Sequence, residues 1–328
     1  MIKAASDSPK LSVHEARQQA AEAVKQALMG APNPVCEITS HLAAAQGKGI
    51  RTLLLLYAAM DSGGLVSCDA VKAAAAIELF HMATLVHDDV IDDAPLRRGI
   101  PTVQHKFGKK NAVICGDYLL CLAVSLIMPL HTDYQEYTGL LPAFTSALSR
   151  TCMGELRQLH NNRNIALGIP AYLRIIADKT AALFYVAAFA GALIARYTHD
   201  EAMRLARFGR YFGMVFQIVD DCKDYEVSEE EALKTVGKDF SEGVVTLPLI
   251  YAFRNSPQLR EMAKGAFDDA AMARRLAKAV CDADGTRKSR DLAARYADKA
   301  RLLLSSFPAY KTNSLLELLN KSIGAQRA

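Results

Sequence analysis

The sequence predicts an all-α protein that folds as a single helical domain. Apolar residues recur at helical spacing along most of the 328 residues, and no stretch shows the regular apolar–polar alternation of a β-strand. The chain has no Trp and is 7% aromatic but 51% hydrophobic, so its core must be built from Ala, Leu, Ile and Val. This composition favours helices. The chain is longer than a usual single core, yet an all-helical enzyme of this size can be one domain.

Charge and cysteine usage exclude several classes of protein. The formal net charge of +4 is small, and no basic run reaches five residues, so we expect no nucleic-acid partner. The seven Cys contain no CxxC pair, which favours reduced thiols in a cytoplasmic protein. The first residues lack the apolar core of a secretory signal. The longest central run without charge, residues 180–195, is 16 residues and short for a membrane span. We therefore expect a cytoplasmic protein without a membrane span.

The helices are predicted from apolar periodicity and from the residues that interrupt it. We expect residues 1–10 to form a flexible tail and residues 11–328 to form the domain. Gly30 and Pro34 end the first amphipathic helix, and a glycine-rich turn precedes the third one. Residues 61–67 read as a loop. The expected helices cover residues 11–29, 35–45, 52–60, 69–93, 112–130, 142–160, 172–197 with a break at 178–180, 201–226, and further stretches between 249 and 328.

Four aspartates close the helix expected over residues 69–93. Asp88 and Asp92 are four residues apart and share a helix face, as do Asp89 and Asp93. Like charges at this spacing repel, and the preceding apolar residues indicate partial burial, so the cluster needs a countercharge. Its oxygen ligands suit a hard divalent cation, above all Mg2+, which is usually held by one or two carboxylates and substrate phosphates. An acidic helix end would explain one such cluster without any metal.

A second cluster repeats the Asp-Asp-x-x-Asp spacing at the end of another mostly apolar helix. It contains Asp220, Asp221 and Asp224, and Gln217 lies on the same helix face as Asp220 and Asp224. Either cluster alone would be weak evidence. Two of them, each closing an apolar helix, favour a metal–diphosphate site over two coincidental acidic turns.

Basic residues near these clusters favour a phosphate ligand. Arg97 and Arg98 directly follow the first cluster and are suited to bind phosphate oxygens. Gly47, Lys48 and Arg51 lie in a glycine-rich turn that opens a helix, where unpaired N–H groups attract anions. Such a turn is weak evidence by itself, because many are only turns.

With these motifs the sequence resembles the trans-polyprenyl diphosphate synthases, from about residue 46 to residue 248, and in particular their medium- and long-chain members. The resemblance implies the isoprenoid-synthase fold, an all-α bundle around a central cavity. It also implies condensation of isopentenyl diphosphate with an allylic diphosphate, with Mg2+ neutralising the leaving diphosphate. The metal ligands that it implies are Asp88, Asp92 and Asp220, with Asp89, Asp221 and Asp224 as further ligands or supports.

The resemblance also implies the residues that bind substrate. Gly47, Lys48 and Arg51 match the block that binds isopentenyl diphosphate, with Arg98 and His81 completing this site, although a lone histidine in an apolar helix is usually a core residue. Lys179 would assist catalysis, or it would merely pair with Asp178 as a structural ion pair. The residues implied for the allylic diphosphate are Lys179, Thr180, Gln217, Lys234 and Arg97.

Product length is tied by the resemblance to the residues before the first aspartates. Ala83 and Thr84 stand where short-chain members commonly carry a bulky aromatic residue, with Phe80 further along the helix. Because both are small, we expect a tunnel that stays open past a farnesyl chain and a medium- or long-chain product. The alternative is that Ala83 and Thr84 only allow close helix packing and that another side chain closes the tunnel.

Three departures from the family pattern keep other functions open. Gly49 replaces an arginine, Leu233 a glycine and Val244 a lysine. A non-catalytic subunit of a heteromeric synthase, a short-chain synthase, a class I terpene cyclase and an acidic cation-binding protein remain alternatives. The second Asp-Asp-x-x-Asp cluster argues against the cyclase, and the basic residues near both clusters argue against the cation-binding protein. The family suggests a homodimer, and some longer-chain members need a second, different subunit.

Overall fold

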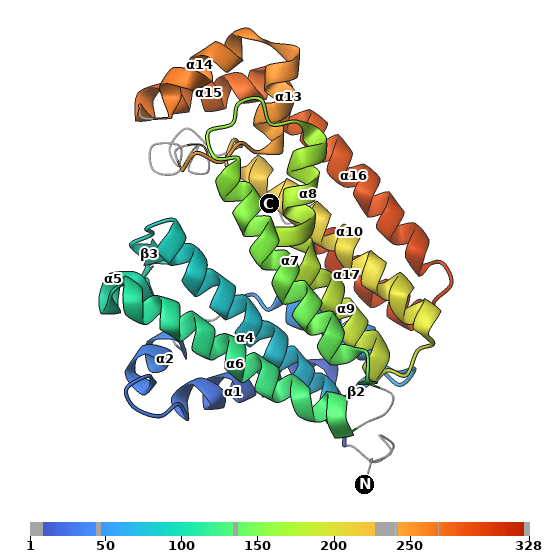
Figure 1. Ribbon diagram of the computed structural model, residues 1–328. Coiled ribbons are helices and arrows are strands. Elements are labelled where there is room, and N and C mark those ends of the chain that lie inside the picture. Colours follow the sequence, from blue (N-terminus) through green and yellow to red (C-terminus); the bar gives the residue numbers. More distant parts are fainter. Residues whose placement is uncertain are drawn as a thin grey trace. The chain divides into compact units, whose positions relative to one another are not determined.

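The computed structural model describes residues 9–43, 47–133, 137–226, 240, 242–267 and 269–324, and helices dominate it (Figure 1). The all-α prediction is confirmed. Contacts divide the chain into two compact units, and most of their boundaries fall within helices. The first comprises residues 1–146, 186–206 and 306–318, and the second comprises residues 147–185, 207–305 and 319–328. The prediction of a single domain therefore stays a prediction.

The first unit is built around the long helix α4, which carries the first aspartate cluster. Nine of its residues between Ala70 and Phe80 are buried, most of them alanines, so neighbouring helices can approach closely. Helix α6 lies alongside α4 (Figure 1), and at Gly116 any side chain would overlap the ring of His87. The helices of this part of the chain are α1 Val13–Met29, α2 Cys36–Ala43, α3 Ile50–Ala59, α4 Cys68–Ile91, α5 Val103–Phe107 and α6 Lys109–Asp133.

Two short antiparallel pairs of strands were not predicted. Strand β1, Lys10–Ser12, pairs with β2, Leu65–Ser67, and β3, Leu96–Arg97, pairs with β4, Ile100–Pro101. The first pair places Lys10 in a strand although we expected it in the tail, and it places β2 in the expected loop. Strands of two or three residues are too short to show an alternating pattern, so the sequence gives no signal for them.

Later segments of the chain complete the first unit. They are the start of α7 (Leu140–His160), the end of α9 (Ala181–Ile194), the start of α10 (His199–Lys223) and most of α17 (Ala309–Gly324). At Gly191 of α9 a side chain would overlap the backbone of α3, so the two helices cross at closest approach. Lys311 of α17 is fully buried and donates a hydrogen bond from Nζ to the carbonyl of Ala58, 2.6 Å away. These contacts join the C-terminal helix to α3.

The second unit contains the second aspartate cluster at the end of α10. The predicted break at residues 178–180 is present: α8 and α9 are separate helices bent by 46°. Glycines bring the elements together here, because a side chain at Gly154 would overlap the backbone of Lys179, and one at Gly213 would crowd Ala181. The helices found in this unit alone are α8 Ile169–Lys179, α13 Leu247–Asn255, α14 Gln258–Ala266, α15 Ala270–Asp282 and α16 Gly285–Leu304.

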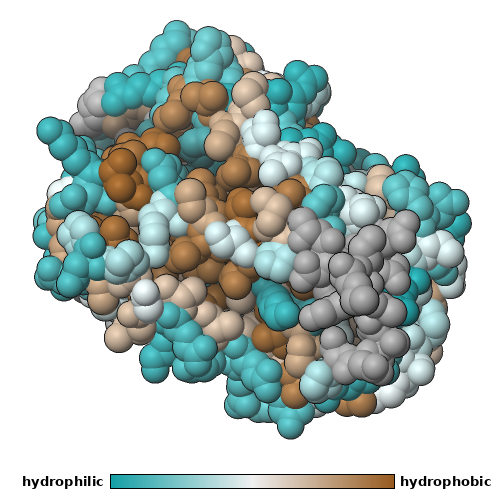
Figure 2. All heavy atoms as spheres, turned by 60° about the horizontal axis from the view of Figure 1, so that its bottom comes forward, coloured by the Kyte–Doolittle hydropathy of each residue, from teal (hydrophilic) through white to brown (hydrophobic). Residues whose placement is uncertain are grey.

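Helix α6 is unusually apolar for its exposure. In the described part of the chain it is the one helix long and apolar enough to cross a membrane, and 33% of its most apolar window is buried; α8 and α9 pass the same test only as a bent pair. Val113, Ile114 and Met128 of α6 are exposed. Figure 2 shows one face of the molecule, on which hydrophobic residues reach the surface among polar ones.

Candidate functional site

The first aspartate cluster divides into two carboxylates near the surface and two that hold other elements. Asp88 is half-buried in the last turn of α4, and the exposed Asp92 caps the helix, its N–H donating to the Asp88 carbonyl over 2.8 Å. Asp89 is only 5% exposed and accepts a 2.8 Å hydrogen bond from Nε of Arg97. Asp93 pairs with Lys109, which lowers the pKa of the Asp93 carboxyl. Asp89 and Asp93 thus fasten the β3 strand and the start of α6.

The carboxylates of Asp88 and Asp92 suit a cation whose remaining ligands come from a bound substrate. Among the described residues, no group of three or more His, Cys, Asp or Glu side chains is arranged to hold a metal ion. Asp88 and Asp92 offer carboxylate oxygens one helical turn apart. Mg2+ is commonly held by one or two carboxylates together with substrate phosphates, so this pair suits it better than a metal that needs an all-protein cage.

A cavity in the first unit joins the glycine-rich turn to α4. Its empty volume, which includes space open to solvent, is about 860 Å³, and both apolar and charged residues line it. Three cationic side chains, Arg17, Lys25 and Arg98, line it with one carboxylate, Glu78. The remaining lining residues are Ala20, Ala21, Val24, Leu28, Leu42, Ala43, Gly47, Gly49, Thr52, His81, Met82 and Leu85.

His81 takes part in this cavity as a neutral ring. Its Nε2 lies 3.1 Å from Nη1 of Arg51, and a guanidinium only donates, so Nε2 accepts and the ring proton is on Nδ1. Burial, and then the charges of Arg51, Arg97 and Arg98, hold the pKa of His81 well below its usual range. Burial also lowers the pKa of Arg51, to about 10, against the opposing effect of Glu78. Arg51 stays charged at neutral pH.

Gly47 allows charged side chains to pack against the turn. A Cβ at this position would lie 3.2 Å from Nη1 of Arg98 and 3.4 Å from Oε1 of Glu78. Glu78 also accepts a hydrogen bond from Thr52, 3.2 Å away. The structure thus brings Gly47, His81 and Arg98 to one cavity, whereas the side chain of Lys48 is exposed and is not part of its lining.

The second cluster is organised by the buried Asp221. Its Oδ2 accepts from the Tyr172 hydroxyl at 2.5 Å and its Oδ1 from Nε2 of Gln217 at 2.7 Å, and Gln217 in turn accepts from Thr180 at 2.7 Å. Burial raises the pKa of Asp221 to about 7. The two hydrogen bonds lower this pKa, and the negative charges of Asp220 and Asp224 raise it further. Because both Asp221 oxygens are hydrogen-bonded, this residue supports the site and positions Gln217.

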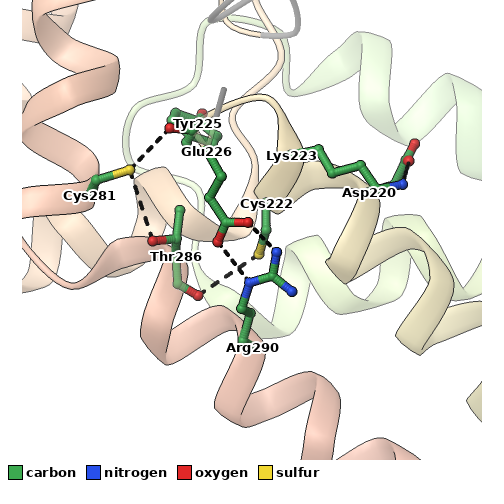
Figure 3. Close-up of polar contacts among 8 residues, drawn as sticks. All are labelled: Asp220, Cys222, Lys223, Tyr225, Glu226, Cys281, Thr286 and Arg290. Atoms are coloured by element: carbon green, nitrogen blue, oxygen red, sulfur yellow. Dashed lines mark hydrogen bonds and ion pairs between the residues drawn. The ribbon is translucent and has the colours of Figure 1, made fainter. Parts of the chain in front are cut away.

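Asp220 is exposed, in contrast to Asp221. Its carboxylate lies 2.8 Å from Nζ of Lys223 one turn later, a surface pair that a divalent cation can displace at small cost. The turn after α10 is fastened to α15 and α16 (Figure 3): Arg290 of α16 pairs with Glu226 through Nε at 2.7 Å, and Cys281 of α15 donates to the Tyr225 carbonyl at 3.1 Å. These contacts fix the end of the helix that presents Asp220.

Lys179 does not pair with its sequence neighbour. Its Nζ lies 2.5 Å from Oε2 of Glu155 on α7, whereas Asp178 is engaged by Arg157 and Arg150 of α7. The alternative of a Lys179–Asp178 pair is therefore wrong. The reason is geometric, because consecutive residues at the end of α8 point to different sides of that helix.

Other predicted residues are located without a test of their role. Lys234, Leu233 and the stretch around them lie outside the described residues. Ala83 and Phe80 are fully buried, and Thr84 is half-buried and donates to the His81 carbonyl. The ring of Phe80 packs against Phe144 with a centroid distance of 5.2 Å. The role of these residues in product length stays a prediction.

Sequence reasoning missed three residues of these surroundings. Glu78 lies three residues before His81 and so shares its helix face, a signal that was present. Tyr172 and Arg17 carry no such signal. Tyr172 looks like a core aromatic at the start of an apolar helix, and Arg17 like one of many solvated charges on an amphipathic helix.

Comparison with known proteins gives consistent matches. A protein-family model described as polyprenyl synthetase matches residues 32–282. The heptaprenyl diphosphate synthase component 2 of Geobacillus stearothermophilus is 36% identical over 92% of this chain and 93% of its own. The nonaprenyl diphosphate synthase of Mycobacterium tuberculosis is 32% identical over 82% of this chain and 79% of its own.

Solved structures agree with these matches. The heptaprenyl diphosphate synthase of Staphylococcus aureus superposes with a TM-score of 0.87 at 28% identity, covering 96% of this chain and 99% of its own. A polyprenyl synthase of Caulobacter crescentus, complexed with calcium and isoprenyl diphosphate, gives 0.84 at 31% identity and covers 96% of each chain.

Proposed function

Because this chain belongs to the polyprenyl synthetase family, we propose that it condenses isopentenyl diphosphate with an allylic diphosphate to make a medium- or long-chain trans-polyprenyl diphosphate. The observation that supports this most directly is the cavity of the first unit. It combines cationic side chains at the glycine-rich turn with apolar side chains from α1, α2 and α4. That is the chemistry of a small diphosphate ester with a hydrocarbon tail.

In this cavity the cationic side chains would bind the diphosphate of isopentenyl diphosphate. Arg98 supplies a guanidinium whose fork matches phosphate oxygens. His81, neutral and protonated on Nδ1, is held by Arg51 and can donate one further hydrogen bond. The residues of this cavity would act by positioning the double bond of isopentenyl diphosphate next to the developing cation. A double bond held there reacts without a strong base.

The groups that we propose for the allylic diphosphate are the aspartate cluster of the first unit and, in the second unit, the other aspartate cluster and Lys179. Asp88 and Asp92 in the first unit, and Asp220 in the second, would be the carboxylates that hold Mg2+, and the bound cation would supply positive charge to a departing diphosphate. Lys179, oriented by Glu155, adds a cation, and Thr180 and Gln217 are fixed through Asp221. Arg97 is held by Asp89, so its contribution is to orient the loop that carries Arg98.

We also propose that two copies of this chain associate through α6. Val113, Ile114 and Met128 are exposed apolar side chains of this helix, which a second subunit would cover. Asp117 within α6 and the packing of α6 along α4 favour an interface over a membrane span, and a cytoplasmic location fits this proposal. The alternative is a second, different subunit, which the relatives named component 2 favour.

A steady-state assay of the purified chain tests the proposal. The chain is incubated with Mg2+, excess isopentenyl diphosphate and dimethylallyl, geranyl or farnesyl diphosphate, and products are sized by mass spectrometry. Products longer than farnesyl diphosphate support the proposal, and a product that stops there indicates a short-chain synthase. No condensation with any primer contradicts activity of the chain alone, and light scattering of the same sample gives its oligomeric state.

A further inference from the structure

Arg17 lies where it can reach the ligand of the cavity described above. It is the fifth residue of α1, a helix fixed at its start by a capping box in which Ser12 and Glu15 bond reciprocally. The Arg17 side chain lines the cavity and donates from Nη2 to the carbonyl of Lys48, 3.0 Å away. The guanidinium of α1 is therefore attached directly to the glycine-rich turn.

Position 49 explains why an arginine from another helix is suitable here. Gly49 has a φ of +61°, in the left-handed region that favours glycine, and it caps the start of α3. A Cβ at this position would lie 3.9 Å from Nε of Arg17. A longer side chain growing from position 49 would therefore compete with Arg17 for the same space.

We propose that Arg17 is a diphosphate-binding residue of this cavity, presented from α1 beside Gly49. Within the described residues, Arg17 has no carboxylate at ion-pair distance and makes one hydrogen bond, through one of its five N–H groups. Among the described residues of the lining, Glu78 is the one acid, and it accepts a hydrogen bond from Thr52. Arg17 thus adds a positive charge that is not ion-paired within the described residues, beside the single negative charge that Glu78 contributes to the lining.

Binding of inorganic pyrophosphate tests this inference apart from catalysis, since the inference rests on the proposed function. Titration calorimetry is done on the full chain with EDTA present, so that aspartate-held cations do not contribute. Arg17→Ala should weaken pyrophosphate binding at least tenfold, and Arg17→Lys should weaken it less. Lys110→Ala, an exposed charge on α6 outside the cavity, is the matched control for lost net charge and should stay within twofold of wild type.

Three results would overturn the inference. The first is that the wild-type chain does not bind pyrophosphate. The second is that the dissociation constant of Arg17→Ala for pyrophosphate is within twofold of the wild-type value. The third is that Arg17→Ala and Lys110→Ala lose the same amount of pyrophosphate affinity. Thermal melting of each variant shows whether its fold persists. If the wild type binds pyrophosphate but catalyses no condensation, the proposed reaction fails and the role of Arg17 is still decided.

Replacing Gly49 by arginine separates ligand contact from support of the turn. In the Arg17→Ala background the space beside position 49 is vacant, so Gly49→Arg should recover part of the lost affinity. In the otherwise wild-type chain, Gly49→Arg should not strengthen pyrophosphate binding. Arg17 already occupies the space, and a side chain at position 49 strains the left-handed backbone. In the assay, Arg17→Ala should raise KM for isopentenyl diphosphate with kcat nearly unchanged. A fall in kcat alone would contradict a binding role.

Discussion

Lys179 at the end of α8 lies with its Nζ 2.5 Å from Oε2 of Glu155 on α7. The two helices approach this closely because Gly154 has no side chain to meet the backbone of Lys179. Both side chains are largely shielded, at 23% and 13% exposed, so the pair sets the direction of the ammonium group. The neighbouring Asp178 is occupied by two arginines of α7 and does not compete for it.

Removing the ammonium group should weaken binding of the allylic substrate. Lys179→Ala should raise KM for the allylic diphosphate about tenfold or more, since a charge-assisted hydrogen bond contributes about 1.5–3 kcal/mol. Glu155→Gln keeps the lysine but loosens its orientation and should have a smaller effect in the same direction. Steady-state kinetics with each substrate varied in turn measures both. A KM for isopentenyl diphosphate that rises as much as the allylic KM would contradict this assignment.

The exposed and buried aspartates should differ in what their loss does. Asp88→Ala or Asp220→Ala should lower kcat by several orders of magnitude, because each removes a metal ligand that matters most as the leaving charge develops, and the melting temperature should be nearly unchanged for the exposed Asp220. Single-turnover rates at saturating Mg2+ together with thermal melts test this. Near wild-type turnover in either variant would disprove the metal assignment.

Asp89→Ala and Asp221→Ala should instead destabilise the fold as well as impair turnover. Asp89 is 5% and Asp221 4% exposed. Loss of Asp89 removes the hydrogen-bond acceptor of Arg97, and loss of Asp221 removes the acceptor of Gln217 and Tyr172. A buried polar group left without its partner costs about 1–3 kcal/mol. Urea denaturation measures the free energy of unfolding, with Asp92→Ala as the exposed comparison. Equal stability in all these variants would show that the buried carboxylates do not hold their partners.

The two aspartate clusters could be predicted from the sequence because their information is local. Spacing along a helix predicts that Asp88 lies with Asp92, which caps α4 in helical conformation, whereas α10 ends at Lys223, one residue before Asp224. Which carboxylate is buried depends on a distant partner, such as Arg97 for Asp89 or Tyr172 for Asp221, and local spacing does not contain it. For the same reason, the sequence did not predict that Glu155 pairs with Lys179 or that Arg17 lies beside Gly49. Both contacts depend on how distant parts of the chain pack together.

Product length should respond to bulk near the first cluster. Ala83→Phe should shorten the main product while a short allylic primer is still consumed. Ala83 is fully buried, so the new ring also overpacks its surroundings at a cost of typically 1–3 kcal/mol, and Thr84→Phe at the half-buried neighbour is the second variant. Mass spectrometry after incubation with excess isopentenyl diphosphate gives the product length. Unchanged long products from both folded variants would rule out this wall as the floor of the tunnel.

Stability should depend on pH through the buried Lys311. Burial lowers its pKa from 10.5 to about 7, opposed by Asp61, and its Nζ lies 4.3 Å above the ring of Tyr197. Between pH 7 and 10.5 the unfolded chain binds the extra proton, so this lysine makes stability rise with pH, by at most about 1.4 kcal/mol per pH unit. Burial raises the pKa of Tyr197, which opposes this trend near the upper end of the range.

The measurement is urea denaturation at pH 7, 8 and 9 for the wild type and Lys311→Met. The wild-type chain should gain stability over this range relative to the variant, because methionine has no proton to exchange. Parallel pH profiles for the two proteins would mean that Lys311 stays charged in the folded chain.

The short pairing of β1 with β2 determines how far the chain can be trimmed at its start. Lys10 pairs with Ser67, which directly precedes α4, and its Nζ reaches Asp61 at 2.6 Å. Ser12, the last residue of β1, is also the cap of α1. A deletion that ends before Pro9 leaves these contacts in place, whereas one that extends through Ser12 removes the strand and the cap together. At this end of the chain, a difference of a few residues therefore separates a truncation that leaves the fold unchanged from one that destabilises α1, the helix that carries Arg17.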